Sequence, residues 1–400
     1  MNSMKKITVF VLAAMFAKPS MAQDDKSNLL GQLNTITTAV PFLMISPDAR
    51  AGGMGDLGVS TSADANSIHW NPSKLAFAEK KTGFAVSYTP WLKALVNDIF
   101  LGYLAGYTRI DNNQAIGGSL RYFSLGNITF TDNDGNAIRD FKPNEFALDI
   151  AYSRKLSKNL SGGIALRFIH SNLTGGITVQ GSESKAGNTG AADVSVFYQK
   201  DIELGDKDAV FTTGLNISNI GAKISYTETG TKNFLPINLR IGPGVRIKLN
   251  EFNDLGFHID FNKLLVPTPP IYGADSSDGS KDVIIFGQDP DVSVAQGIFQ
   301  SFGDAPNGGS EELKEVNYAI GMEYWYDKQF AFRAGYFNES QLKGNRKYFT
   351  LGAGLRYNVF GIDLAYLIPT QQRNPLENTL HFTLTFDFDA FDDQNKKTEE

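Results

Sequence analysis

The residues whose spacing could bind a ligand lie near the start of the chain, in DARAGGMGDLGVS, residues 48–60. Within this stretch, GMGDLG at residues 53–58 has the form G-x-G-x-x-G, a loop that cradles the phosphates of a dinucleotide. Such a loop must follow a buried strand and open an apolar helix. Here Pro47 interrupts any preceding strand, and the following VSTSADANS has no apolar helical stripe. The pattern therefore does not predict nucleotide binding.

Other residues that could do chemistry are few, because the chain has four histidines and no cysteine. The absence of cysteine excludes a disulfide framework, thiolate metal sites and a cysteine nucleophile. His258 and His381 are expected to face inward beside carboxylates, which leaves a serine–histidine–aspartate arrangement open, although a satisfied polar contact is favoured. TDNDGN at residues 131–136 resembles a calcium loop, but with Gly135 at the sixth position Phe130 stands at the first. We therefore assign no catalytic residue, no metal ligand and no cofactor.

The first residues of the chain indicate export. Residues 1–22 resemble a secretory signal peptide, with Lys5 and Lys6, an apolar run over residues 7–17, and a small-residue cleavage site that ends at Ala22. The apolar run is too short to span a bilayer as a helix. The net charge of −6 and the lack of a basic stripe give no reason to expect nucleic acid as a partner.

Most of the remaining sequence alternates between apolar and polar residues with a period of two. In INLRIGPGVRIKL, residues 237–249, one face is apolar and the other is polar or glycine. Successive side chains of a strand point to opposite faces, so each such segment predicts a strand with one apolar side. About fourteen segments of this kind, each of roughly ten residues, begin near the following positions: Gly83, Ile99, Gln114, Phe146, Leu160, Ala191, Ala209, Ile237, Leu255, Val316, Phe330, Tyr348, Gly361 and Leu380.

These segments predict an all-β fold: a transmembrane outer-membrane β-barrel of about fourteen antiparallel strands over residues 82–389. Short polar turns alternate with long loops, as in barrels that have turns at one rim and loops at the other. A soluble sandwich or propeller would also alternate, but it would seldom present so many large apolar side chains on one side of every strand. An acidic periplasmic tail, residues 390–400, follows the last strand.

The inward face of these strands is charged, which predicts a lumen whose charges pair with each other or with a plug. The residues expected to point inward are Arg121, Arg167, Arg240, Arg246, Arg333, Arg356, Asp149, Asp260, Glu323 and Asp363. Residues 23–81 precede the first strand and are too polar to lie in lipid. We therefore expect them to pack in the barrel, where glycines let backbones approach closely.

A two-part motif in that segment resembles a known family. PDARAGGMGDLGVSTSADANSIHWNPSKLAF, residues 47–77, resembles the N-terminal signature of the PorV family, the outer-membrane barrel of type IX secretion systems. That family belongs to the FadL-like group of fourteen-stranded barrels, the long-chain fatty acid transporter superfamily. The matching positions are Asp48, Ala49, Arg50, Ala51, Gly53, Met54 and Gly55 in the first part, and Asn71, Pro72, Ser73, Leu75 and Ala76 in the second.

By this resemblance, residues 23–81 form a hatch inside the barrel near its periplasmic end. Proline fixes its own φ and biases the preceding Asn71 toward an extended conformation, so the Asn-Pro pair is expected to set a turn. The motif residues are expected to be structural: Asp48, Arg50, Gly53, Gly55, Asn71 and Pro72.

The largest loop, residues 267–314, is the expected working surface outside the cell. It carries apolar residues that must be buried against the loop itself, the barrel or a partner. Folding back as a cap and binding a partner are both open at this point. The candidate partner-binding residues are Ile284, Ile285, Phe286, Ile298, Phe299 and Phe302.

The resemblance implies a non-enzymatic outer-membrane component of the type IX protein secretion system. Such proteins associate with the giant barrel that is the translocon, bind the C-terminal signal domains of exported proteins, and shuttle this cargo to the surface attachment machinery, a sortase complex. The membrane lipids surround the barrel. The alternative is a FadL-like transporter of fatty acids or other hydrophobic compounds, which requires a continuous apolar pocket between hatch and wall.

Overall fold

The computed structural model describes residues 33–388, apart from residues 94, 132–133, 177, 180–181, 228–229, 231, 274–282 and 372–373. The expected signal peptide and acidic tail lie outside these residues, as do the first ten residues of the expected hatch.

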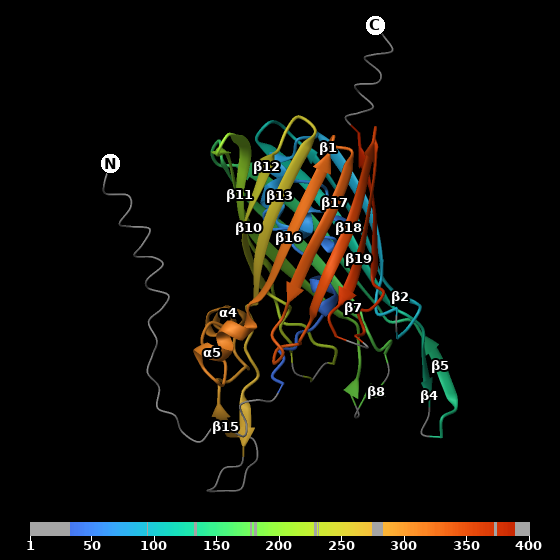
Figure 1. Ribbon diagram of the computed structural model, residues 1–400. Coiled ribbons are helices and arrows are strands. Elements are labelled where there is room, and N and C mark those ends of the chain that lie inside the picture. The colour runs from blue at the N-terminus through green and yellow to red at the C-terminus, as the bar shows by residue number, and fades with distance from the viewer. Residues whose placement is uncertain are drawn as a thin grey trace. The chain divides into compact units, whose positions relative to one another are not determined.

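Fourteen antiparallel strands form a closed barrel, in which β1 pairs with both β2 and β20 (Figure 1). This confirms the predicted fold. The first seven strands are β1 (Thr82–Pro90), β2 (Ile99–Arg109), β3 (Gln114–Leu125), β6 (Asn144–Lys155), β7 (Leu160–Asn172), β10 (Gly187–Leu204) and β11 (Lys207–Gly221). The other seven are β12 (Asn238–Lys248), β13 (Asn253–Leu264), β16 (Asn317–Tyr326), β17 (Phe330–Asn338), β18 (Lys347–Tyr357), β19 (Phe360–Pro369) and β20 (Leu380–Asp387).

The apolar–polar alternation places the strands well, because it reflects the two environments of the wall. β10 begins four residues before its predicted start, and the other thirteen begin within two residues of theirs. Ile241 and Ile320 are exposed on the outer face, whereas their neighbours Arg240 and Ala319 are buried in the interior. All ten charged residues expected to point inward are buried or half-buried.

The two rims of the barrel differ. At one rim, which we call the short-turn end, residues 327–329 join β16 to β17 and residues 358–359 join β18 to β19. At the other, the long-loop end, loops carry the remaining elements (Figure 1). These elements are the hairpins β4 (Ile128–Thr131) with β5 (Ala137–Phe141), β8 (Thr178–Val179) with β9 (Ser182–Glu183) and β14 (Ile271–Gly273) with β15 (Val283–Phe286), and the helices α4 (Val294–Gln300), α5 (Gly309–Glu312) and η4 (Leu313–Glu315). Among the described residues, no helix is long and apolar enough to cross a membrane.

Residues 33–81, here called the lumen segment, contain four short helices and pack against the inner wall. The helices are η2 (Pro41–Met44), α2 (Ala49–Gly52), α3 (Ser67–Trp70) and η3 (Pro72–Phe77). The segment starts at the long-loop end, where the Asn34 N–H donates to the Leu342 carbonyl at 3.0 Å. It leads into β1 at the short-turn end, so it extends from one rim of the barrel to the other.

Apolar residues near the start of the segment pack against the wall toward the long-loop end. Phe42 and Leu43 are buried in one cluster with Leu101 and Ile169 of the wall. Farther along, Met54 and Leu57 are buried with Phe337, Tyr348 and other wall residues. Segment and wall side chains therefore share two apolar clusters inside the barrel.

Wall glycines allow the lumen segment to lie directly on the strands. A Cβ added at Gly335 of β17 would lie 2.1 Å from the carbonyl carbon of Met54 and 2.2 Å from the nitrogen of Gly55. A Cβ at Gly321, its partner on β16, would lie 2.6 Å from the Met54 oxygen. Because the neighbour in each case is backbone, no side chain can rotate away to make room.

We therefore expect Gly335→Ala to destabilise the protein by about 1–3 kcal/mol, the usual cost of overpacking a filled interior. Urea-induced unfolding in detergent measures this. Gly303→Ala is the matched control, since a Cβ there has nothing within 4 Å. Equal stability of the two variants would contradict the close approach.

Candidate functional site

Asp48 organises the start of the two-part motif by capping α2. Its Oδ1 accepts the Ala51 N–H at 3.0 Å, as an N-cap side chain does. Its Oδ2 accepts the indole N–H of Trp70 at 2.7 Å, which ties α2 to α3. A helix of four residues cannot hold itself together, so this cap fixes the direction in which Arg50 leaves it.

Arg50 joins the lumen segment to the wall through a buried fork of charged hydrogen bonds. Its Nε donates to Glu323 Oε1 at 2.9 Å and a terminal nitrogen donates to Oε2 at 2.8 Å. The other terminal nitrogen donates to Asp64 Oδ2 at 2.9 Å and to the Ser62 carbonyl at 3.1 Å. Paired N–H donors on one carboxylate give both strength and a fixed geometry.

The ionic contacts continue from Glu323 along the wall. Arg333 donates to Glu323 at 2.8 Å and to Asp363 at 2.8 Å, and Arg356 donates to Asp363 at 2.6 Å. The Trp325 ring lies 5.4 Å from the Arg333 guanidinium and 5.5 Å from that of Arg356. Arg50, Glu323, Arg333, Asp363 and Arg356 thus link the lumen segment with β16, β17, β18 and β19.

The remaining motif residues also make backbone or wall contacts. Gly55 adopts a φ of 78°, which favours glycine, and donates its N–H to Thr350 at 2.8 Å. A Cβ on Gly53 would lie 3.0 Å from the Cα of Gly352 in β18. Asn71 is extended, with a φ of −167°, and Pro72 opens η3.

Asn71 connects two parts of the lumen segment to the wall. Its side-chain nitrogen donates to the carbonyls of Val59 and Val196, each at 3.1 Å, and its oxygen accepts the Ser73 N–H. None of these positions leaves a charged group facing open space. Arg50, Gly53, Gly55 and Asn71 therefore contact the wall, whereas Asp48 joins two helices of the segment.

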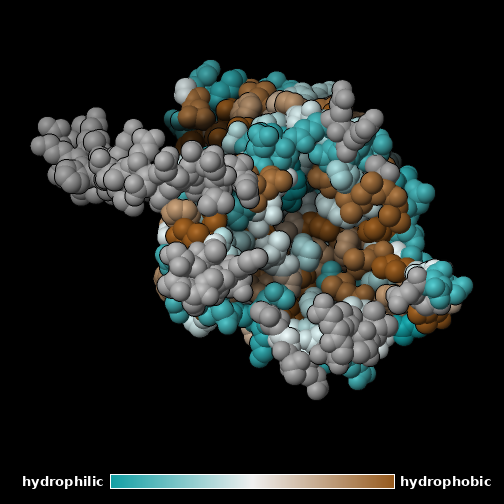
Figure 2. Space-filling view, turned by 90° about the horizontal axis from the view of Figure 1, so that it is seen from below, coloured by the Kyte–Doolittle hydropathy of each residue, from teal (hydrophilic) through white to brown (hydrophobic). Residues whose placement is uncertain are grey.

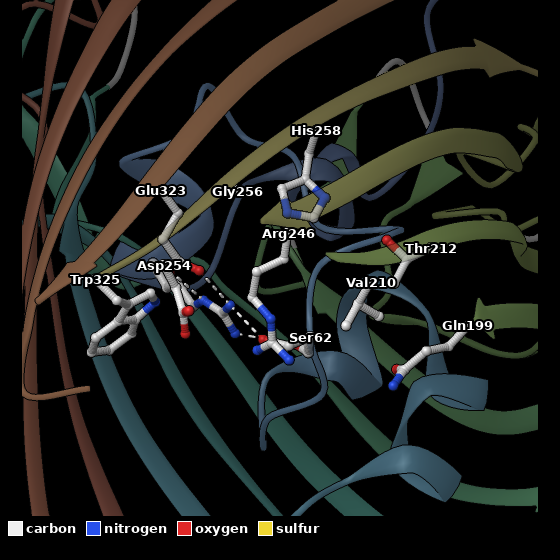
Figure 3. Close-up of a pocket in the computed structure, with 11 residues that line it drawn as sticks. Ser62, Gln199, Val210, Thr212, Arg246, Asp254, Gly256, His258, Glu323 and Trp325 are labelled. Carbon is white, nitrogen blue, oxygen red and sulfur yellow. Dashed lines mark hydrogen bonds and ion pairs between the residues drawn. The ribbon is translucent and has the colours of Figure 1, made fainter. Parts of the chain in front are cut away.

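A small cavity lies between the lumen segment and the wall (Figure 3). Figure 3 shows Glu323 and Trp325 on one side of it and Thr212 and Gln199 on the other. Its volume is about 20 Å³, enough for roughly one water molecule. The Nδ1 of His258, which also lines it, lies 3.2 Å from the hydroxyl of Ser60.

Among the residues that the structure describes, both inward-facing histidines pair with hydroxyl groups and neither with a carboxylate. The partner of His258 is the Ser60 hydroxyl, and that of His381 is the Thr89 hydroxyl at 3.1 Å. Each histidine nevertheless interacts with a carboxylate nearby: His258 shares its cavity with Glu323, and His381 interacts electrostatically with Asp56.

The predicted partner-binding loop is folded, and its apolar side chains divide into two sets. Ile285, Phe299 and Phe302 are 46%, 78% and 54% exposed. Ile284 and Phe286, on the other face of β15, are half-buried, as is Ile298 of α4. Strand alternation and helical periodicity produce this division. Seen from the long-loop end, apolar and polar side chains are interspersed around a central hollow (Figure 2).

A group of buried charges, here called the rim clasp, fastens this loop to the barrel. Lys263, near the end of β13, donates to Glu312 at 3.0 Å and to Glu315 at 2.5 Å. Lys343, from the loop between β17 and β18, donates to Glu311 at 2.6 Å and to Glu315 at 3.0 Å. The rim clasp was not predicted from the sequence, although the closely spaced charges of EELKE, residues 311–315, indicated that ion pairs could form there.

Asp304 is a further buried carboxylate beside the rim clasp. Its Oδ2 accepts the Thr268 N–H at 3.0 Å, and Thr268 also donates its hydroxyl to Glu315 at 2.7 Å. Burial, and then the negative charges of Glu312 and Glu315, raise the pKa of Asp304 to about 6. Although burial alone would raise it, hydrogen bonds from Lys263 and Thr268 lower the pKa of Glu315 below its ordinary value.

Comparison with known proteins gives one family match. The family described as "Type IX secretion system protein PorV" matches residues 28–271. No curated protein matches the chain significantly.

Several solved barrels are similar in structure at low sequence identity. The toluene transporter TodX of Pseudomonas putida is 13% identical, with 88% of this chain and 98% of that chain covered and a TM-score of 0.49. The toluene transporter TbuX of Ralstonia pickettii is 11% identical, with 86% and 97% covered and a TM-score of 0.45. A FadL homologue of Pseudomonas aeruginosa is 13% identical, with 89% and 99% covered and a TM-score of 0.43.

Removing the guanidinium of Arg50 should release the lumen segment from the wall. Arg50→Gln leaves Glu323 and Asp64 buried without their common partner, and breaking a buried pair in this way costs about 3–5 kcal/mol. We expect a lower unfolding free energy and faster proteolysis of residues 46–66. Arg154→Gln, at an exposed arginine on β6, is the control. A stable, protease-resistant Arg50→Gln protein would contradict the role of the fork.

Protonation of Asp304 should tighten the loop as the pH falls. Since its folded pKa is raised to about 6 from an ordinary value of 3.8, its ionisation destabilises the folded loop above that pH. We expect hydrogen exchange of residues 283–302, corrected for intrinsic rates, to be slower at pH 5 than at pH 7. Asp304→Asn should abolish the difference, whereas Asp289→Asn, at an exposed aspartate, should keep it. A difference that persists in Asp304→Asn would exclude this carboxylate as its source.

Proposed function

The chain belongs to the PorV family of type IX secretion system proteins and is an outer-membrane β-barrel, and from this premise we propose that it works by binding and handing over exported proteins. The proposed role is non-enzymatic. The observation that carries it is the family match, which extends over residues 28–271. The proposed partners are the giant translocon barrel, the C-terminal signal domains of exported proteins and the surface attachment complex.

The long-loop end is the proposed recognition surface. In outer-membrane barrels the long loops face outside the cell, where exported proteins arrive. Phe299 and Phe302 are exposed large side chains of the kind that serve as binding anchors. The rim clasp fixes the loop that carries them, and such preorganisation lowers the entropy cost of binding.

The lumen segment is the proposed hatch. Arg50, Asn71 and the apolar residues Phe42 and Leu43 join it to the wall over much of the barrel. With this segment packed against its inner wall, the barrel is suited to present a surface at the membrane, and secreted proteins would cross through the separate translocon. We infer that the segment stays in place while cargo is handed over.

The alternative is a transporter of hydrophobic compounds. That role needs an apolar cavity large enough for its ligand, and ligand cavities usually have volumes of about 300–1,000 Å³. The cavity between segment and wall holds about 20 Å³, and Arg50, Arg246 and Glu323 are among its lining residues. The small volume of this cavity argues against a ligand site at this position and favours the secretion role.

Affinity purification from gently solubilised outer membranes tests the proposal. We expect the tagged protein to retain a giant barrel protein and exported proteins that share a C-terminal domain. Phe299→Ser combined with Phe302→Ser should reduce retained exported proteins at least tenfold, because the apolar anchors are lost. Phe252→Ser is the matched control, since Phe252 is 52% exposed at the short-turn end.

A barrel purified alone with a bound lipid would contradict the secretion role and support the transporter. If the loop variant and the control retained exported proteins equally, Phe299 and Phe302 would not be recognition residues.

A further inference from the structure

The first described residues of the lumen segment lie extended across the long-loop end. Between residues 33 and 38 exposure alternates, with Leu33, Thr35 and Thr37 exposed and Asn34, Ile36 and Thr38 half-buried. This is the pattern of a strand with one face on a support. Val40, with a φ of 46° that β-branched residues rarely adopt, then bends the chain into the buried part of the segment.

Three different loops hold this extended stretch by hydrogen bonds. The Asn34 N–H donates to the Leu342 carbonyl at 3.0 Å, and the Ala39 N–H donates to the Phe234 carbonyl at 2.9 Å. The Asn34 side chain donates to the Pro269 carbonyl at 3.2 Å and to Glu311 at 3.1 Å. We call the receiving residues Phe234, Pro269, Glu311 and Leu342 the rim seat.

Ile36 supplies the apolar contact of the stretch. It packs on a buried cluster of Ile237, Leu265 and Val266, which also receives Val294 and Ile298 of α4. The rim seat therefore shares a core with the helix whose opposite face exposes Phe299. Glu311 belongs in turn to the rim clasp, through its ion pair with Lys343.

The stretch is held much less firmly than the residues that follow it. Val40, Phe42 and Leu43 are at most 2% exposed, and Arg50 is fixed by a buried ionic fork. By contrast, residues 33–38 are half-buried at most, with solvent on one face. An extended chain of similar pattern could replace them without disturbing the hatch.

We propose that the rim seat is a binding site for an extended segment of a partner protein, and that residues 33–39 occupy it as an internal stand-in. The partner segment would carry a carboxamide side chain two positions before a β-branched apolar residue, as Asn34 and Ile36 do. Backbone bonds to Phe234 and Leu342 supply affinity, while the Asn34 and Ile36 positions supply specificity. We take this partner to be an exported protein, which rests on the proposed function. The existence of the rim seat does not depend on that function.

Tethering makes the internal stretch a strong competitor, because its effective concentration at the seat is in the millimolar range. A partner segment must therefore displace it. Displacement removes Ile36 from the core beneath α4 and Asn34 from Glu311, so occupancy of the seat is coupled to the loop that carries Phe299.

A synthetic peptide with the sequence of residues 33–39, labelled with a fluorophore, tests the seat on the full chain. The variant Asn34→Ala with Ile36→Ser weakens the internal occupant, and Thr35→Ala with Thr37→Ala changes only its exposed face. By fluorescence anisotropy we expect the peptide to bind the first variant at least tenfold more tightly than the second or the natural chain. A peptide with serine in place of its isoleucine should not bind.

Equal peptide affinity for all three proteins, or no binding to the weakened variant, would overturn the proposal. A labelling experiment gives a second readout, since the chain has no cysteine. Addition of the peptide should speed maleimide labelling of Thr38→Cys, which faces the support, and leave the rate at Thr37→Cys unchanged. An unchanged rate at residue 38 at saturating peptide would also overturn it.

The rim seat and the secretion role can be contradicted independently. Failure of peptide binding while exported proteins still co-purify would remove the seat and leave the secretion role standing. Peptide binding to the weakened variant, with no exported protein retained by the natural chain, would support the seat and contradict the secretion role.

Discussion

The pairing of Arg50 with Glu323 is the contact on which the interior of this protein depends. Burying a carboxylate or guanidinium is costly, and a partner of opposite charge with good hydrogen bonds offsets much of that cost. Glu323 receives both Arg50 from the lumen segment and Arg333 from the wall, and Asp64 takes the other side of Arg50. Segment and wall therefore complete each other electrostatically.

Backbone groups of the lumen segment also bind charged residues of the wall. Asp260 of the wall accepts the N–H groups of Gly58 and Val59 at 2.8 and 3.0 Å, so the GMGDLG turn contributes hydrogen-bond donors to the barrel. Glycines on both sides let the two backbones meet. A motif that resembles a phosphate-binding loop thus serves a carboxylate of the chain itself.

The parts predicted from sequence are those that depend on local pattern. The alternation of apolar and polar residues shows which side of each strand faces lipid. The strand starts and the inward-facing charged residues could therefore be predicted from it. The partners of those charges could not, because Arg50 and Glu323 are 273 positions apart and their pairing depends on closure of the barrel. For the same reason the rim clasp, which brings Lys263 and Lys343 to Glu315, was not expected.

The loops also held more structure than composition indicated. VIIF, residues 283–286, reads as an apolar piece of loop, yet it forms β15 and pairs with β14. Its alternation is too short to identify against a long irregular background. Phe299, a proposed recognition residue, therefore projects from a folded loop that contacts the beginning of the lumen segment through the cluster shared by Ile298 and Ile36.

The central claim is that the lumen segment closes the barrel, and ion conductance of the purified protein in a planar lipid bilayer tests it most directly. The account predicts no steady conductance for the natural chain and open-channel currents for Arg50→Gln. A natural chain that conducts ions steadily, at the level of the Arg50→Gln protein, would contradict it.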